Sequence, residues 1–335
     1  MTGSSGLSKS RMGVNMVMSR NTVKKETLSY ESRSQVQRVH AVKWVPAGDI
    51  KAIIIIAHGM AEHIERYDDF ANYLAKRGIL VAGCDYIGHG KSVVGQELYG
   101  YFCSRDPATV VVRDVHRLKK IIQADYPGFP MIIMGHSFGS FVARNYLCRY
   151  GSGVDGAILM ATGMPPKALI MVSRFLANMQ ALLIGSDKPG KFLNGLAFSA
   201  YNKRIKDAAS PFSWISANKE NVEKYEADPL CGFLFTVNGF QTLGEMIYRI
   251  HKPGNLANVP AQLPILMVAG SEDPVGDYGE GVKRAGKSLK KAGVRDIKIR
   301  LYPWGRHEIL HEDEKEEVYD DIIGWLNEKL NLGVV

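Results

Sequence analysis

The sequence predicts an α/β fold in which helices cover both faces of a mostly parallel central sheet. Short apolar runs of strand length alternate with helical patterns, and this alternation is typical of such a sheet. Residues 52–57 form an unbroken apolar run, as expected for a strand buried on both faces. The length of 335 residues is ample for a large core. Residues 163–262 lack the alternation and are predicted to form an inserted, mainly helical cap domain.

The predicted elements follow the chain in order. The strands are expected at 27–32, 36–45, 52–57, 79–84, 131–134, 154–160, 264–269 and 297–302. The first helix has Tyr67, Phe70 and Leu74 on one face and ends at Gly78. The second begins at the capping pair 106–107 and ends before residue 127. Further helices are expected at 137–150, 282–292 and 314–330.

Charge and composition divide the chain further. The formal net charge is +8, and residues 1–25 hold five basic residues and no acid. We interpret this segment as a disordered basic tail, with binding to nucleic acid or anionic lipid as the alternative. The core is assigned to residues 26–162 and 263–335, and no nucleic-acid partner is expected. The four cysteines are far apart, which argues against a disulfide framework and favours a reducing, cytoplasmic location. We expect neither a signal peptide nor a membrane span.

The motif Gly135-His136-Ser137-Phe138-Gly139 carries the chemistry. It lies between an apolar strand and a helical pattern, which is the context of a nucleophile elbow. The turn projects the serine hydroxyl above the sheet, and a Cβ at either glycine would press on a neighbouring strand or helix. Ser137 is therefore the predicted nucleophile.

A serine nucleophile needs a base, and the base needs a group that orients it. In this context an acid and then a histidine follow the serine along the chain. Asp273 lies in the turn after a predicted strand, and its neighbour Glu272 is the local competitor. His307 lies in the loop after the last predicted strand. The predicted catalytic residues are Ser137, Asp273 and His307.

The oxyanion of an acyl-transfer intermediate requires two backbone N–H donors. The residue after the nucleophile, Phe138, is expected to supply one of them. The loop after residues 52–57 is expected to supply the other through Met60, since Gly59 allows a close backbone approach.

A second motif competes with this interpretation. His307-Glu308-Ile309-Leu310-His311 matches the zinc-protease pattern, which requires both histidines on one face of a helix. Pro303 and Gly305 lie just upstream, and Glu328 is the one plausible third ligand after His311. The zinc interpretation is therefore disfavoured, and no metal or cofactor is expected.

Over residues 26–335 the chain resembles the α/β-hydrolase superfamily, and in particular its monoacylglycerol lipase and lysophospholipase branch. The resemblance rests on the segments 58–63 (HGMAEH), 85–92 (DYIGHGKS), 135–139 (GHSFG) and 228–233 (DPLCGF). Many members have arginine where this chain has Ile87. The resemblance implies a cap over the serine and hydrolysis of single-chain acyl esters, either monoacylglycerols or lysophospholipids.

The cap sequence is consistent with an apolar substrate. Residues 168–184 are strongly apolar, and we expect Leu169, Val172, Phe175 and Leu176 to line an acyl tunnel. Packing on the core and transient contact with a membrane surface are the alternatives. The cap carries eleven lysines and arginines against seven acids, a net charge of +4 that mildly favours anionic interfaces.

Two other functions use the same residues. An aminopeptidase or amidase would need cap carboxylates to hold a substrate amine, and four glutamates are available, at 220, 223, 226 and 245. The positive charge of the cap argues against it. A ligand-binding protein on an inactive hydrolase fold is the third alternative, and the complete Ser–Asp–His pattern argues against that one.

Overall fold

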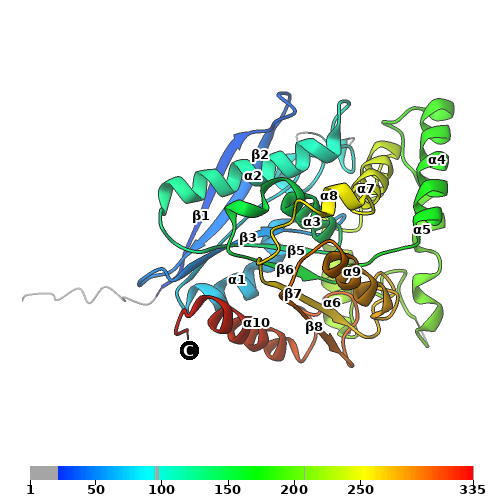
Figure 1. Ribbon diagram of the computed structural model, residues 1–335. Coiled ribbons are helices and arrows are strands. Elements are labelled where there is room, and N and C mark those ends of the chain that lie inside the picture. Colours follow the sequence, from blue (N-terminus) through cyan, green and yellow to red (C-terminus); the bar gives the residue numbers. More distant parts are fainter. Residues whose placement is uncertain (1–21, 94, 96–97, 207, 335) are drawn as a thin grey trace, which may run out of the picture.

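A computed structural model describes residues 22–93, 95, 98–206 and 208–334 of the chain. Within these residues one eight-stranded sheet has the strand order β1-β2-β4-β3-β5-β6-β7-β8. β1 pairs antiparallel with β2, and β2 with β4, while the remaining pairs are parallel. The predicted α/β class with a mostly parallel sheet is therefore confirmed (Figure 1).

The strands lie close to their predicted positions. They are β1 (Lys24–Glu31), β2 (Arg38–Val45), β3 (Ala52–Ala57), β4 (Ile79–Cys84), β5 (Met131–His136), β6 (Gly156–Met160), β7 (Ile265–Gly270) and β8 (Ile297–Tyr302). Every residue of β3 to β7 is buried, as the continuous apolar runs indicate. β8 lies at the sheet edge and alternates basic with apolar residues.

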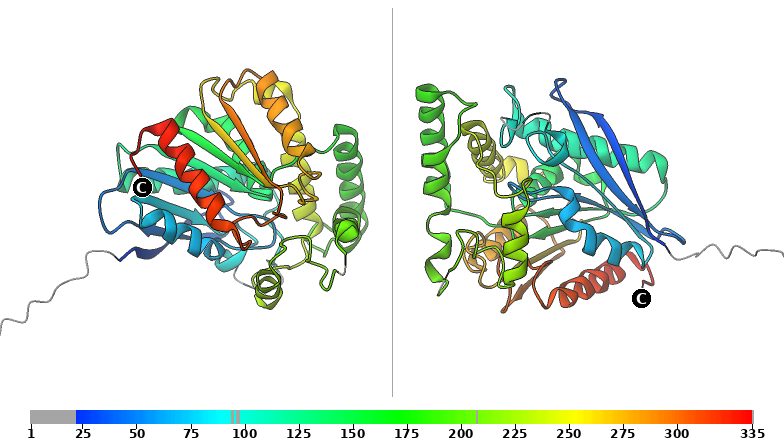
Figure 2. Two further views of the ribbon diagram at one scale, coloured as in Figure 1. Left: turned by 90° about the horizontal axis from the view of Figure 1, so that it is seen from below. Right: turned by 180° about the vertical axis from the view of Figure 1, so that it is seen from behind.

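Two layers of helices sandwich the sheet (Figure 2). On one face the apolar side chains of α2 (Pro107–Asp125), α3 (Phe138–Tyr150) and α9 (Glu280–Lys291) join one hydrophobic cluster. On the other face α1 (Asp68–Ala75) and α10 (Lys315–Leu330) join a second cluster. The predicted cap of α2 is present, since the Asp106 side chain accepts a hydrogen bond from the Thr109 N–H.

The segment between β6 and β7 is mainly helical in its described residues. It contains α4 (Lys167–Ile184), α5 (Lys191–Phe198), α6 (Lys219–Ala227), α7 (Val237–Arg249) and α8 (Pro253–Leu256). α7 packs on the core through Met246 and Ile247. α4 stands at the outer side of the molecule, beyond α7 (Figure 1). It is also the one helix of the described residues that is long and apolar enough to cross a membrane by length and composition.

The N-terminal boundary differs from the prediction. Residues 1–21 of the predicted tail lie outside the described residues, whereas Lys24 and Lys25 belong to β1. They pair with Val45 and Trp44 of β2, and the Lys25 ammonium lies 2.7 Å from an Asp68 carboxylate oxygen. Because two basic residues begin this strand, an apolar pattern alone places its start too late.

Candidate active site

Ser137 occupies the turn between β5 and α3. Its backbone has φ 52° and ψ −119°, a region that costs a non-glycine residue roughly 1–3 kcal/mol. The flanking glycines permit this turn. A Cβ on Gly135 would collide with the Gly139 carbonyl, and one on Gly139 would collide with the Ala57 carbonyl of β3. The two glycines therefore allow the sharp turn at Ser137, where the chain leaves the direction of β5 and enters α3.

His307 joins the serine to an acid. Its Nε2 lies 2.8 Å from the Ser137 Oγ, and its Nδ1 lies 2.9 Å from an Asp273 carboxylate oxygen. His307 is buried, and Asp273 is fully buried. In a low-dielectric surrounding a hydrogen bond between charged partners is stronger than in water. The three predicted residues, which lie up to 170 positions apart in sequence, thus form one hydrogen-bonded chain.

The turn after β7 selects Asp273 over Glu272. The Asp273 oxygen that faces His307 also accepts a hydrogen bond from the Val275 N–H at 2.9 Å, which fixes the carboxylate. Glu272 is exposed to solvent. The structure brings Asp273, and not its neighbour, to the histidine.

The two predicted oxyanion donors lie on adjacent elements. Met60 follows β3, Phe138 begins α3, and β3 pairs directly with β5 up to Ala57 and Gly135. The close approach of Gly139 to the 57–58 carbonyls brings the start of α3 against the loop of Met60. Two backbone N–H groups on this junction can serve a developing negative oxygen.

The buried carboxylate of Glu62 holds this junction, although its position in the sequence predicted no role for it. Glu62 accepts hydrogen bonds from the Gly59 N–H and, at 2.9 Å, from the Tyr67 hydroxyl. The same oxygen lies 3.2 Å from Nδ1 of His136, the residue before the nucleophile. Burial alone would raise the pKa of Glu62, but His136 and Arg66 outweigh burial and hold that pKa well below its ordinary value.

The charged network continues into the loop of His307 and into the cap. Arg66 donates to Glu62 at 2.8 Å and to both oxygens of Glu308 at 2.5 and 2.8 Å. Burial opposes ionisation of Glu308, yet the Arg66 charge outweighs it and lowers the pKa of Glu308 to about 2. Asn221 of α6 donates to Glu308 at 2.7 Å. One buried cluster therefore connects the oxyanion loop, the histidine loop and the cap.

Cap aromatic side chains lie over the histidine. The ring centroids of Trp214 and His307 are 5.0 Å apart. Phe198 stacks on Trp214, and Tyr201 meets Trp214 edge to face at 4.9 Å. The sequence carried no signal for this cluster, because its members are spread over the end of α5 and the short turns that follow it. Trp214, supported from behind by Phe198 and Tyr201, therefore covers one side of the buried imidazole.

The four predicted lining residues do not share one environment. Leu169, Val172 and Phe175 are 52%, 54% and 63% exposed, whereas Leu176 is partly buried against the core cluster. The buried residues of α4 are Ile170 and Ala177. Most of its apolar surface therefore faces outward.

The zinc-protease motif does not form a helix. Residues 307–312 contain turns and bends but no helix, and α10 begins only at Lys315. His307 is bonded to Ser137 and Asp273, and Glu308 is bonded to Arg66. Burial lowers the pKa of the remaining histidine, His311, to about 4, with the nearby Arg66 charge acting in the same direction.

Comparison with known proteins identifies the family. The model of the family described as "Serine aminopeptidase, S33" matches residues 48–314. The chain belongs to this family. It is 28% identical to a monoacylglycerol lipase of Mycolicibacterium smegmatis over 84% of this chain and 90% of that one. It is also 28% identical to the monoglyceride lipase of Mus musculus over 86% of each chain.

Solved structures support the same assignment. A thermostable carboxyl esterase from Bacillus coagulans, solved with glycerol, superposes with a TM-score of 0.83 and 30% identity. The match covers 92% of this chain and all of that one. The fold is an α/β-hydrolase fold, and the chain is a carboxylic ester hydrolase.

Proposed function

We propose that the protein is a serine hydrolase of monoacylglycerols or lysophospholipids that works through an acyl-enzyme. One observation carries the mechanism: His307 bridges Ser137 and Asp273 with hydrogen-bond distances of 2.8 and 2.9 Å. A serine hydroxyl is a weak nucleophile at neutral pH unless a neighbouring base accepts its proton.

In the first half-reaction the Ser137 oxygen attacks the ester carbonyl and His307 takes the serine proton. Asp273 accepts from the other ring nitrogen, so it fixes the tautomer and stabilises the imidazolium. The N–H groups of Met60 and Phe138 bind the oxyanion. His307 then returns the proton to the leaving alcohol, and the acyl group stays on the serine.

In the second half-reaction water attacks the acyl-enzyme by the same route and releases the fatty acid. The aromatic cluster of Phe198, Tyr201 and Trp214 borders His307. The cluster therefore restricts the directions from which substrate and water can reach the imidazole ring. An apolar wall at this point suits an acyl chain better than a peptide backbone, because a buried amide needs hydrogen-bond partners.

The substrate class also rests on the relatives, which are named as monoacylglycerol lipases, and on the surface of the cap. α4 and α5 carry a set of large apolar side chains that are 39% to 81% exposed, here called the apolar cap face: Leu169, Met171, Val172, Phe175, Met179, Leu182, Leu183, Ile184, Phe192 and Leu196. Exposed patches of this kind mark contact sites. We propose that the apolar cap face rests on lipid, with peripheral and not spanning contact, because α4 is tied to α7.

Exposed basic residues border the apolar cap face. Lys167 begins α4, Lys188 lies between the two helices and Lys191 begins α5. Basic residues beside apolar ones favour an anionic lipid surface over a neutral one. We propose that the enzyme takes single-chain lipids from such a surface.

The aminopeptidase or amidase alternative is weakened by the partners of the cap carboxylates. Glu245 is paired with Arg174 and Arg249, and Glu220 with Lys224. Glu226 accepts a hydrogen bond from a serine hydroxyl. At these three positions a substrate amine would have to displace an existing partner, which leaves the exposed Glu223 as the remaining candidate of the four.

Parallel rate measurements test the proposal. Monoacylglycerol, lysophosphatidylcholine and amino-acid p-nitroanilides are compared on the parent enzyme and on Ser137→Ala, with fluorophosphonate labelling as the readout of the nucleophile. We expect ester hydrolysis and labelling in the parent and neither in the variant. Faster release from the anilides than from the esters would favour the amidase instead.

A further inference from the structure

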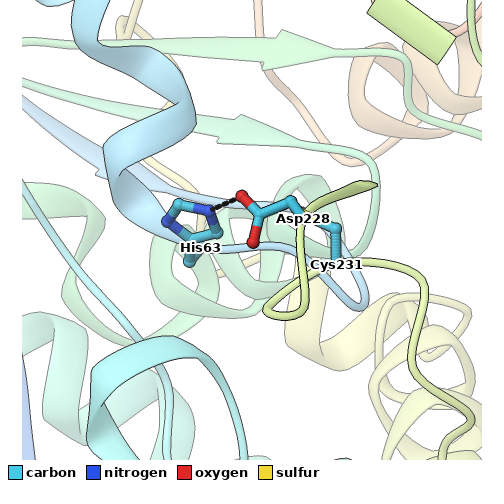
Figure 3. A group of neighbouring side chains, drawn as sticks. All are labelled: His63, Asp228 and Cys231. Atoms are coloured by element: carbon cyan, nitrogen blue, oxygen red, sulfur yellow. Dashed lines mark hydrogen bonds and ion pairs between the residues drawn. The ribbon is translucent and has the colours of Figure 1, made fainter. Parts of the chain in front are cut away.

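Three side chains of different chemistry meet where the cap joins the oxyanion loop. His63, Asp228 and Cys231 each offer one ligand atom, and these atoms all lie within 4.8 Å of one another. Figure 3 shows the imidazole turned toward the carboxylate, with the cysteine on the same turn as the aspartate. The His63 Nε2 is 2.9 Å from an Asp228 carboxylate oxygen.

The three ligand atoms come from two segments that are fastened to each other. His63 ends the loop after β3, and Asp228 ends α6. The Gly232 N–H donates to the Ala61 carbonyl at 2.9 Å, and the Tyr225 hydroxyl donates to the same carbonyl at 3.0 Å. The backbone therefore keeps the histidine beside the aspartate and the cysteine without help from an ion.

The turn also orients two of the side chains. The second Asp228 oxygen accepts the Leu230 N–H at 2.8 Å, and the Cys231 N–H donates to the Asp228 carbonyl at 2.9 Å. One carboxylate oxygen is thus anchored by the backbone while the other faces His63. Support of this kind around a ligand raises metal affinity, because the ligands need little reorganisation.

We propose that His63, Asp228 and Cys231 form a zinc-binding site that clamps the cap turn to the oxyanion loop. Imidazole nitrogen, carboxylate oxygen and thiolate sulfur are the ligands of Zn²⁺, at distances of about 2.0–2.3 Å. In a tetrahedron with those bond lengths the ligand atoms are about 3.3–3.8 Å apart. In the structure the His63 and Asp228 ligand atoms are 2.9 Å apart, and no two of the three ligand atoms are more than 4.8 Å apart. Side-chain shifts of about 1 Å or less would bring all three to the separations of the tetrahedron.

The fourth position has access to solvent. His63 and Asp228 line a groove of about 380 Å³ between the first helical turns of the core and α6. The groove is lined by five carboxylates and three basic side chains: Glu65, Asp68, Asp69, Glu220 and Asp228, with Arg66, Lys224 and Lys315. All of these carboxylates except Asp228 are already paired with lysines, so Asp228 is the carboxylate that the groove offers to an ion. A water in the groove can complete the tetrahedron.

Proton balance follows from the ligands. Zinc replaces the proton of the Cys231 thiol, so one proton passes to solvent as the zinc–sulfur bond forms. In the contact with Asp228 the Nε2 of His63 is the donor and carries the ring proton. When zinc takes the place of that contact, the ring proton of the neutral imidazole moves through solvent to Nδ1, and Nε2 and the Asp228 oxygen each bind the metal. The site is separate from the groups that His307 joins, so ester hydrolysis does not require the ion, and the inference is independent of the proposed function.

Cobalt substitution of the full chain tests the site directly. With one equivalent of Co²⁺ we expect a thiolate-to-cobalt charge-transfer band and the intense visible bands of a tetrahedral ion. Equilibrium dialysis with Zn²⁺ should give one ion per chain. Because the ion binds the folded state, zinc at about 100 times Kd should raise Tm by several degrees.

Variants decide which ligands are responsible. Cys231→Ser should remove the charge-transfer band and most of the zinc-dependent rise in Tm, and Asp228→Asn should weaken binding at least ten-fold. Cys148→Ser, at a partly buried cysteine of α3, is the matched control and should bind as the parent does. Tm is measured with and without zinc for each variant. The rise in Tm caused by zinc can then be compared even where the substitution itself lowers the Tm of the zinc-free protein. A parent spectrum without a thiolate band, or equal zinc increments in the parent and in Cys231→Ser, would overturn the proposal.

Discussion

Single residues set the chemistry through backbone geometry that the sequence signals directly. The positive φ of Ser137 and the two close approaches of Gly135 and Gly139 are local consequences of the elbow. The pairing of Asp273 with His307 depends on where two strands end, and the strand pattern is readable from the sequence. These residues could be predicted because each lies in the turn or loop that follows a predicted strand.

Removal of a member of the triad is expected to cost most of the catalysis. Ser137→Ala and His307→Ala should each lower kcat about a million-fold, because the remaining partners cannot act alone. Asp273→Asn should lower it about ten-thousand-fold by favouring the wrong histidine tautomer. Steady-state release of p-nitrophenol from a p-nitrophenyl ester measures kcat for all three variants. A Ser137→Ala enzyme with substantial turnover is incompatible with a serine nucleophile.

Glu62 shows what the sequence could not predict. Its position in the sequence gives no role, because its partner His136 lies on β5, 74 positions further along the chain. The nearby partners Gly59 and Tyr67 are identified only by the conformation of the folded loop. The same holds for Trp214 over His307, where two chain segments about ninety residues apart come together. Contacts of this kind depend on tertiary packing and leave no periodic pattern.

Glu62→Gln tests this positioning role. The amide cannot satisfy Gly59, Tyr67 and Arg66 together, and loss of a buried charge partner costs about 3–5 kcal/mol. We expect a lower Tm and a fall in kcat of about a hundred-fold from displaced oxyanion donors, with KM little changed. Glu65→Gln is the control, because its pairs with Lys25 and Lys91 are near the surface. Equal effects of the two variants would show that Glu62 has no special position.

At the scale of elements, the positions of the strands and helices could be predicted from the sequence, but the packing partner of each apolar helix face could not. The 3.6-residue period indicates which residues of α4 share a face, and says nothing of the partner of that face. Only Ile170 and Ala177 of this helix are buried, so the expected lining residues divide between Leu176 and an outward set. The start of β1 was missed for a similar reason, since strand pairing and not apolarity holds Lys24 and Lys25.

Two substitutions on α4 separate the inner and outer roles of the helix. Leu176→Asp should reduce kcat/KM for long-chain esters more than for acetate esters, because each CH₂ that loses its apolar contact costs up to about 0.8 kcal/mol. Leu182→Asp, at a residue 81% exposed, should leave both esters unchanged in solution and weaken binding to anionic vesicles. Equal losses on long and short esters in a folded Leu176→Asp enzyme would remove the acyl-tunnel assignment.

At the scale of the whole molecule, the cap and the core share buried polar groups. Glu312, just before α10, accepts hydrogen bonds from the Ser216 hydroxyl and from the Ala217 and Asn218 N–H groups at 2.8–3.0 Å. Arg306 donates to the Ser213 and Ser216 carbonyls. The loop that carries His307 therefore depends on the cap for its shape. Unfolding of the cap and loss of the active site are expected to occur together.

His311, near the contacts between the cap and the loop of His307, should make the free energy of unfolding depend on pH. Burial and the Arg66 charge lower the pKa of His311 to about 4, against an ordinary value near 6.5. Below pH 6.5 the unfolded chain binds a proton there and the folded chain does not, so stability falls as the pH drops and levels off near pH 4. The whole effect is at most about 3 kcal/mol, and partial exposure of the side chain reduces it.

Urea unfolding at pH 7.5, 6 and 4.5 measures this loss in the parent and in His311→Gln. The variant cannot take up the proton, so its free energy of unfolding should decline less over this range, and the two proteins should converge as the pH falls. The comparison is made between slopes, because the amide also alters packing at pH 7.5. Parallel pH dependences in the two proteins would show that His311 titrates normally in the folded state and that the acid sensitivity arises elsewhere.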